Sequence, residues 1–209
     1  MSVIWYFDFI SPFAWLQWPK IKALAQTQQV TLHPILFASV LDHVGQKGPA
    51  EIPAKREFSY RFVLWRAREA GQPLRFPPQH PFNPLASLRL SIAAGNTIEA
   101  VDAIFSWIWA QGQVADTAES LQSVAAPLGI ADPVAALADP LVKQQLRENT
   151  EAAIAAGVYG VPTLSIDGQL FWGGDAHDFA MAYLRDRGLF DDSEMKRITG
   201  LPIGVARKA

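Results

Sequence analysis

The chain has 209 residues, of which 50% are hydrophobic and 18% are charged, and its formal net charge is −2 at pH 7. This length suits one compact domain, or one domain that carries a large insertion. The slightly acidic balance argues against a nucleic-acid-binding protein, which needs a basic surface.

The sequence contains no cysteine. Disulfide chemistry by its own side chains is therefore excluded, and any thiol must arrive with a ligand. The N-terminus lacks the basic region of a signal peptide, and no apolar stretch approaches the roughly 18 residues that span a bilayer. Together these features predict a cytoplasmic protein that binds neither a membrane nor nucleic acid.

The N-terminal part of the chain has the pattern of a β-α-β unit. Residues 3–7 are short, apolar and rich in β-formers, which predicts a buried strand. Ser11 is a suitable helix N-cap with Pro12 at the first helical position, and apolar periodicity predicts a helix to about Gln26. Residues 30–37 predict a second strand, joined to the first by a right-handed crossover.

The middle of the chain is predicted to be helical. A loop rich in Gly and Pro over residues 45–53 precedes a helix that is expected to end near Ala70. Five prolines within residues 73–84 exclude a helix there. Residues 85–156 have a helical pattern throughout. Breaks in that pattern are expected near Gly95-Asn96, Gly112, Gly129 and Pro140.

The β pattern returns near the C-terminus. Residues 163–166 and 169–172 flank an Asp-Gly turn, which predicts a β-hairpin. Asp175 is expected to cap a last helix that ends near Arg187. The segment after that helix is weakly patterned.

This order of elements predicts the fold class. A β-α-β unit, a long all-helical insertion and a β-β-α unit make an α/β thioredoxin-like fold that is interrupted after its second strand. Residues 1–40 and 157–190 are expected to form a discontinuous thioredoxin-like domain. Residues 41–156 are expected to form the helical insertion domain, and residues 191–209 a C-terminal tail.

Ser11-Pro12 stands where a thiol–disulfide oxidoreductase of this fold carries Cys-x-x-Cys at the start of a helix. Ordinary helix capping would account for the dipeptide by itself. In this context, the free N–H groups and partial positive charge of the helix start favour a thiolate, and a hydroxyl adds one more donor. We therefore predict that Ser11 is catalytic and stabilises the thiolate of a bound glutathione.

Two further segments are candidates for binding that tripeptide. A cis bond before Pro162, inferred from the fold, would turn the N–H and C=O of Val161 outward, where an extended peptide can pair with them. An ordinary X-Pro turn is the alternative, since only about one X-Pro bond in twenty is cis. The backbone of Gly174 and the carboxylate of Asp175 suit a γ-glutamyl end, unless this segment only ends a strand and caps a helix.

The insertion supplies candidate substrate contacts. Lys55, His80 and Asn83 lie in a helix and a proline-rich loop that could cover a site. A solvated surface is the alternative for Lys55, and an Asx turn for Asn83. The four histidines lack the spacing of metal ligands. The tryptophans of this region are expected in the core rather than on a substrate shelf; they are Trp65, Trp107 and Trp109.

Several motifs in combination resemble the 2-hydroxychromene-2-carboxylate isomerase family, which is related to kappa-class glutathione transferases and DsbA-like oxidoreductases. The motifs are Tyr6 to Ala14, Pro53 to Arg56, His80 to Pro84, Gly160 to Thr163 and Phe171 to Asp175. The resemblance implies a thioredoxin-like fold with a helical insertion, glutathione as cofactor and a homodimer. It also implies cis–trans isomerisation of a small aromatic catabolite by reversible addition of the glutathione thiolate.

By this resemblance, Ser11 stabilises the thiolate, Val161 pairs with the peptide backbone, and Gly174 with Asp175 holds the γ-glutamyl group. The sequence departs from the family at two positions in the part of the insertion that would cover the site. Gln46 stands where relatives often carry Asn. Phe62 stands where relatives often carry Asp, so the particular substrate is open.

Two other functions remain open at this point. A kappa-class-like glutathione transferase would use the same thiolate but keep the adduct. A non-catalytic peptide-binding module would use the same groove without chemistry. Glutathione-dependent isomerisation is the leading hypothesis.

Overall fold

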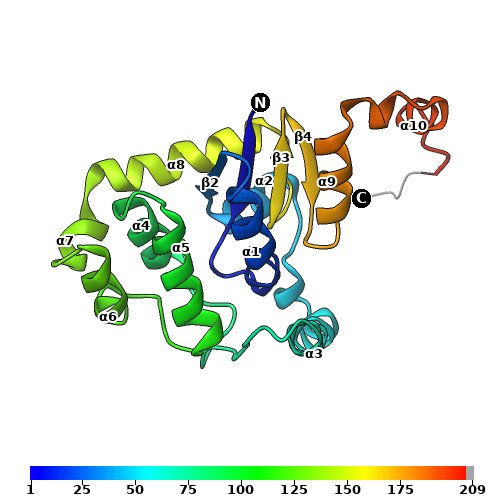
Figure 1. The fold of residues 1–209 in the computed structure, drawn as a ribbon. Helices are drawn as coiled ribbons and strands as arrows, with labels where there is room; N and C mark the ends of the chain where they lie inside the picture. Colours follow the sequence, from blue (N-terminus) through cyan, green and yellow to red (C-terminus); the bar gives the residue numbers. More distant parts are fainter. Residues whose placement is uncertain (206–209) are drawn as a thin grey trace.

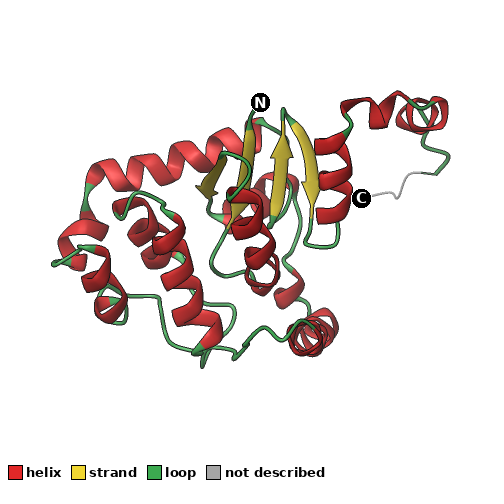
Figure 2. Ribbon diagram, in the orientation of Figure 1, coloured by secondary structure: helices red, strands yellow, loops and turns green. Residues whose placement is uncertain are grey.

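The structure, a computed structural model, describes residues 1–205. Its centre is a four-stranded sheet in the order β2-β1-β3-β4 (Figures 1 and 2). The strands are β1 (Val3–Phe7), β2 (Val30–Pro34), β3 (Thr163–Ile166) and β4 (Gln169–Trp172). β1 pairs in parallel with β2 and antiparallel with β3, and β3 pairs antiparallel with β4.

Alternation along β1 separates two hydrophobic clusters. Trp5 and Phe7 face a large cluster that includes residues of α1 (Pro12–Ala25), α4 (Leu85–Ala93), α5 (Ile98–Phe105) and α9 (His177–Arg185). Tyr6 faces a smaller cluster with residues of α2 (Phe37–Val44) and α8 (Pro140–Ala155). Side chains of successive strand residues point to opposite faces. Because both faces of β1 are covered, the strand that leads into α1 is held in the interior.

Helices make up most of the remaining chain (Figure 1). Their bounds are α2 Phe37–Val44, α3 Pro53–Glu69, α4 Leu85–Ala93, α5 Ile98–Phe105, α6 Gln122–Ala125, α7 Pro133–Ala138, α8 Pro140–Ala155, α9 His177–Arg185 and α10 Ser193–Thr199. Short 3-10 turns cover Pro49–Glu51, Ala126–Leu128 and Arg187–Asp191, and a π turn covers Ser106–Ala110.

The thioredoxin-like order of elements is confirmed, as are β1, the start of α1 and the C-terminal hairpin. The second strand was predicted to reach residue 37, which is wrong. β2 ends at Pro34, and Phe37 begins α2. The last hydrogen bond toward β1 runs from Ile35 N–H to the carbonyl of Phe7, where β1 ends, so the chain has no further strand to pair with beyond it. The expected boundary between residues 40 and 41 therefore falls inside a helix.

The prediction of helix throughout residues 85–156 is wrong for the stretch before α6. Gly112 has φ +69°, and the N–H of Gln113 turns back to the carbonyl of Trp107, so the helix cannot continue. The predicted breaks near Gly95, Gly112, Gly129 and Pro140 are all confirmed.

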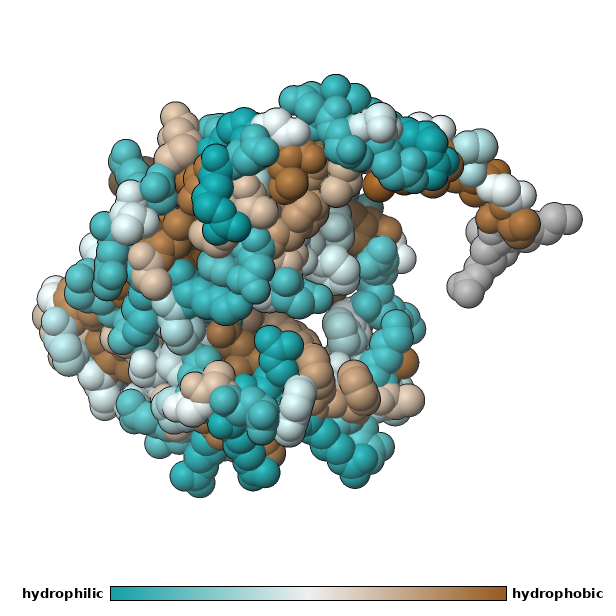
Figure 3. Space-filling view, turned by 45° about the vertical axis from the view of Figure 1, so that its right-hand side comes forward, coloured by the Kyte–Doolittle hydropathy of each residue, from teal (hydrophilic) through white to brown (hydrophobic). Residues whose placement is uncertain are grey.

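The C-terminal predictions need one correction. The last thioredoxin helix, α9, begins at His177 with Ala176 as N-cap and ends at Arg185, so Asp175 does not cap it. The weakly patterned segment after it contains the 3-10 turn and α10, with the Asp192 carboxylate capping α10. The 3-10 turn packs against α9 through Phe190, whereas α10 stands off from the body (Figures 1 and 3). Residues 206–209 of the predicted tail lie outside the described residues.

A carboxylate on α5 links the insertion to the middle of α1. Asp102 accepts hydrogen bonds from Trp18 Nε1–H at 2.7 Å and from the Lys22 ammonium at 2.6 Å. Trp18 is fully buried. Removing the acceptor would leave a buried donor without a partner, which is more costly than the loss of an exposed ion pair.

We expect Asp102→Ala to lower the free energy of unfolding by about 1–3 kcal/mol. Asp178→Ala is the control, because Asp178 is exposed and lies 3.7 Å from the Lys20 ammonium in a surface pair. That control should change stability by less than about 0.5 kcal/mol. Urea denaturation of both variants measures the difference, and equal effects would contradict the role given to Asp102.

Candidate functional site

Ser11 lies at the junction of β1 and α1, as predicted. Its hydroxyl oxygen accepts a hydrogen bond from Ala14 N–H at 3.3 Å, and Pro12 is the first helical residue. The hydroxyl proton is not used in that bond and is free to be donated to another group. Only 7% of Ser11 is exposed, so a group bound there would be largely shielded from water.

A buried acid shapes the turn that presents Ser11. The Asp8 carboxylate accepts from Ile10 N–H at 3.0 Å through Oδ1 and from Phe37 N–H at 3.0 Å through Oδ2. The carbonyl of Asp8 accepts from Ser11 N–H at 3.1 Å. Burial raises the pKa of the Asp8 carboxyl to about 7, against the opposing effect of the hydrogen bonds from backbone N–H groups.

Two side chains of the insertion hold the carbonyls of the same turn. Trp109 Nε1–H donates to the Phe9 carbonyl at 2.8 Å. His80 Nε2 lies 2.8 Å from the Ile10 carbonyl, and because a carbonyl only accepts, this nitrogen carries the proton. The Phe9 and Ile10 carbonyls are thereby fixed by residues far along the chain.

His80 is in turn held by residues of α3. Its Nδ1 lies 2.6 Å from the Tyr60 hydroxyl, and its carbonyl accepts from the Arg56 guanidinium at 2.8 Å. Burial lowers the pKa of His80, and the charge of Arg56 acts in the same direction. A neutral ring protonated at Nε2 fits its bond to the Ile10 carbonyl.

The Val161–Pro162 bond is cis, as predicted. β1 and β3 are antiparallel with Tyr6 opposite Thr163, and continuing this register puts Pro162 and Val161 beside Phe7 and Asp8. The loop therefore lies at the sheet edge from which the chain enters Ser11. Within residues 1–205, neither the N–H nor the C=O of Val161 has a hydrogen-bond partner.

The segment after β4 lies along the start of α1. A Cβ on Gly174 would come within 3.6 Å of the Gln17 Cβ and within 3.9 Å of the Phe13 carbonyl. Gly173 has φ +90°, and a Cβ there would collide with the Asp175 carboxylate, so glycine is required. Asp175 itself is exposed. The two predicted γ-glutamyl contacts are thus next to the first turns of α1.

The predicted substrate residues are placed differently from one another. His80 is at the Ser11 turn, whereas Lys55 is exposed in the first turn of α3. The Asn83 side chain accepts from Leu85 N–H at 3.1 Å, which confirms the Asx turn.

The prediction that Trp65 belongs to the core is wrong, since 53% of it is exposed. Trp109 is fully buried.

Three contributors to the site were not identified from the sequence: Asp8, Tyr60 and Trp109. A single acid directly after an apolar strand was the available signal for Asp8. Nothing local marks Tyr60 or Trp109, because their partners lie 20 and 100 residues away.

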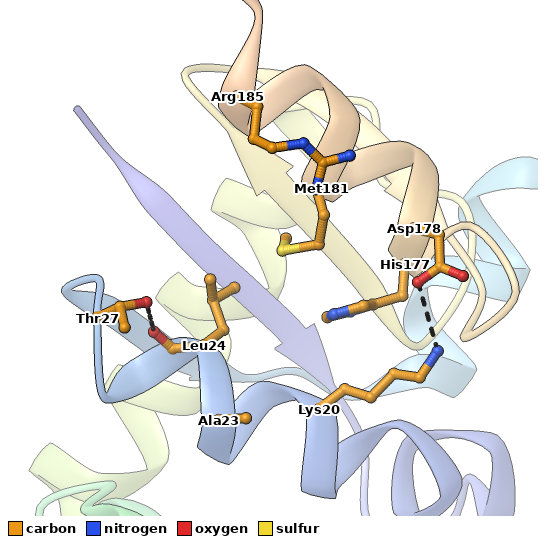
Figure 4. Close-up of a pocket in the computed structure, with 8 residues that line it drawn as sticks. All are labelled: Lys20, Ala23, Leu24, Thr27, His177, Asp178, Met181 and Arg185. Atoms are coloured by element: carbon orange, nitrogen blue, oxygen red, sulfur yellow. Dashed lines mark hydrogen bonds and ion pairs between the residues drawn. The ribbon is translucent and has the colours of Figure 1, made fainter.

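A separate groove of about 480 Å³ lies between α1 and α9 (Figure 4). Lys20, Leu24, His177 and Met181 are among its lining residues, and Figure 4 shows the His177 ring extending from α9 toward α1. The groove begins one turn beyond Gln17 and does not include Ser11.

No group of three or more His, Cys, Asp or Glu side chains in the described part of the chain could hold a metal ion. No helix among residues 1–205 is long and apolar enough to cross a membrane.

Comparisons with protein families, with curated proteins and with solved structures all find thioredoxin-like relatives of the same kind. The family model of the DSBA-like thioredoxin domain matches residues 2–185. A 2-hydroxychromene-2-carboxylate isomerase of Pseudomonas putida is 31% identical over 84% of this chain and 90% of its own length. Glutathione S-transferase kappa 2 of Caenorhabditis elegans is 26% identical over 78% of this chain and 80% of its own length. A solved structure of a 2-hydroxychromene-2-carboxylate isomerase superposes with a TM-score of 0.75 at 26% identity, covering 93% of this chain and 99% of that one.

The raised pKa of Asp8 predicts a pH dependence of stability. Between about pH 4 and pH 7 the folded protein keeps a proton that the unfolded chain has lost, so this contribution to stability falls as the pH rises and is lost above the folded pKa of about 7. Between pH 5 and pH 8 the free energy of unfolding of the wild type should fall by roughly 3 kcal/mol more than that of Asp8→Asn, since each of two pKa units corresponds to about 1.4 kcal/mol. Urea denaturation at both pH values measures this, and parallel pH profiles would refute it.

Proposed function

Because this chain belongs to the DSBA-like thioredoxin-domain family and to the 2-hydroxychromene-2-carboxylate isomerase family, we propose that it is a glutathione-dependent cis–trans isomerase of 2-hydroxychromene-2-carboxylate-type aromatic substrates. One observation carries the proposal. Among residues 1–205, neither the Ser11 hydroxyl proton nor the backbone N–H and C=O of Val161 have a hydrogen-bond partner, and these groups lie at the same edge of the sheet, in a chain without cysteine.

The residues present fit a tripeptide thiol. Val161 offers one donor and one acceptor, which an extended peptide satisfies like an added strand. Gly174 and Asp175 lie beside α1, where the backbone suits a carboxylate and the Asp175 side chain suits an ammonium group. The carbonyl of Pro162, next to Val161, accepts from Gly173 N–H at 2.8 Å, which links the Val161 loop to the segment that holds Gly174 and Asp175.

Ser11 would hold the sulfur as its anion. The helix start contributes partial positive charge and the hydroxyl contributes a charge-assisted hydrogen bond. Lowering a thiol pKa by about two units from about 8.5 makes most of the thiol ionised at pH 7. When bound, glutathione supplies a thiolate that adds reversibly to the substrate C=C bond, which permits rotation before elimination.

Lys55, His80 and Asn83 are proposed substrate contacts. Lys55 is the best suited to a substrate carboxylate, because its ammonium is exposed and has no ion-pair partner among residues 1–205. Both ring nitrogens of His80 and the amide oxygen of Asn83 already have partners. His80 would therefore act mainly by orienting the Ser11 turn.

A kappa-class-like glutathione transferase is the second candidate, favoured by the similarity to glutathione S-transferase kappa 2. It would use the same thiolate and release the adduct instead of eliminating glutathione. A non-catalytic peptide-binding module is the third. If calorimetry with millimolar glutathione shows no binding, the non-catalytic module is favoured over both enzymes. If glutathione binds, the turnover assay follows.

We propose a cytoplasmic location, because glutathione is kept reduced there. We also propose the homodimer that the family resemblance implies. Sedimentation velocity of the purified protein tests the oligomeric state.

Ser11→Ala should lower glutathione-dependent isomerisation of the chromene carboxylate by about 10- to 100-fold at pH 7, the value of one charge-assisted hydrogen bond. Activity should partly recover at pH 9, where the thiol ionises without help. A spectrophotometric assay with and without glutathione measures both effects.

The matched control is Thr97→Ala. Thr97 is also an N-cap, and its hydroxyl accepts from Ala100 N–H at 3.2 Å at the start of α5. This variant loses a cap but should keep full activity. Turnover without glutathione, or an unimpaired Ser11→Ala, would refute the role given to Ser11.

A further inference from the structure

The groove between α1 and α9 is lined by side chains from two facing helices. Lys20 and Leu24 are one turn apart on α1, and His177 and Met181 are one turn apart on α9. Figure 4 shows Leu24, Met181 and the His177 ring directed into the space between the helices. The volume of about 480 Å³ is within the range of small-molecule sites. The groove is therefore large enough for a small ligand.

His177 brings a polar group without a partner into this groove. Only 7% of the residue is exposed, and its Nδ1 is buried without a hydrogen-bond partner. Its Nε2 has no hydrogen-bond partner among residues 1–205 either. Buried polar groups of folded proteins are nearly always hydrogen-bonded. An imidazole in this state therefore indicates a bound molecule as its partner.

The position of the ring proton determines what His177 can bind. Burial lowers the pKa of His177, and the charge of Lys20 acts in the same direction while Asp178 opposes it, so the ring is neutral at pH 7. A proton on Nδ1 would be buried without an acceptor, which is costly, whereas a proton on Nε2 can be donated into the groove. His177 therefore requires an acceptor there, and an anion is the strongest one.

The rim of the groove has an excess of positive charge. The Lys20 ammonium lies 3.7 Å from Asp178, and 47% and 91% of the two side chains are exposed. Such a surface pair contributes little, so the ammonium can turn to a ligand. Arg185 also lines the groove and has no ion-pair partner among residues 1–205. Two cations and one carboxylate leave the rim suited to an anion.

The floor of the groove is aliphatic. Leu24 is 7% exposed, and Met181 is half-buried against the main hydrophobic cluster. Ala23 completes this lining, and no Phe, Tyr or Trp is among the described residues that line the groove. Methionine is unbranched and adapts its shape to a neighbour. An alkyl chain therefore complements this floor better than a planar ring does.

We propose that the groove between α1 and α9 is a binding site for a short aliphatic carboxylate, separate from the site at Ser11. The carboxylate accepts from His177 Nε2–H and pairs with the Lys20 ammonium. Its alkyl chain lies over Leu24 and Met181 toward Arg185. No step of the proposed isomerisation uses these residues, so the inference does not depend on that function.

Calorimetric titration of the full-length protein with hexanoate tests the inference. Hexanoate should bind at least about 10-fold more tightly than acetate, because each buried CH₂ group strengthens binding about fourfold. Hexylammonium should not bind. His177→Leu should weaken hexanoate binding about 10-fold, the effect of one charge-assisted hydrogen bond. Lys20→Met, at an exposed position that folding does not require, should weaken it about 2- to 5-fold.

Two variants and one spectroscopic measurement serve as controls. Arg147→Ala removes an exposed cation from α8 and should leave hexanoate binding unchanged. Asp178→Ala removes a carboxylate from the rim and should tighten binding about 2- to 5-fold, which a loss of folded protein could not imitate. In the wild type, hexanoate should raise the pKa of His177 by about one unit, as followed by NMR.

Three results would overturn the inference: hexanoate binding no tighter than hexylammonium binding, equal affinity of His177→Leu and the wild type, or an equal loss in Arg147→Ala. Saturating glutathione should leave the affinity for hexanoate within twofold. Displacement of hexanoate by glutathione would also overturn the inference, because the groove would then belong to the glutathione site. Hexanoate binding without any glutathione-dependent turnover would refute the proposed function and support the groove site.

Discussion

The turn from Asp8 to Ser11 is the constraint on which the site depends. It leaves a central strand in the interior, where unpaired backbone groups are costly. The Asp8 carboxylate accepts two backbone N–H groups, and the carbonyls of Phe9 and Ile10 accept from Trp109 and His80. With these partners the turn has one conformation, and the start of α1 is presented at a fixed position.

The helical insertion is therefore more than a cover for the site. It supplies the two donors that hold the Phe9 and Ile10 carbonyls, and its Asp102 accepts hydrogen bonds from Trp18 and Lys22, further along α1. The insertion thus fixes both the entry to α1 and the middle of the helix. A substitution that changes the packing of the insertion is therefore expected to shift the position of Ser11 through these hydrogen bonds, even if the substituted residue does not contact a ligand.

Electrostatics at the helix start involve two opposing effects. The N-terminus of α1 and the Ser11 hydroxyl favour an anion. Asp8 is the first residue of the turn that leads into this helix, and the negative charge of its ionised carboxylate would oppose a bound anion. Burial raises the pKa of Asp8 to about 7, so near neutral pH this carboxyl is partly protonated and its opposition to a bound thiolate is reduced.

The sequence by itself determined the features that depend on neighbouring residues. The apolar run of β1, the Ser11-Pro12 helix start and the Asp-Gly hairpin have local physical causes, and the cis bond before Pro162 was inferred from the fold that they imply. The tertiary structure alone decided that Phe37 begins a helix, that Asp175 does not cap α9 and that Trp65 is exposed. It also brought His80 and Trp109 to the Ser11 turn. The positions of His80 and Trp109 depend on hydrogen bonds to residues 70 and 100 positions away, and partners at that separation leave no periodicity or spacing in the chain.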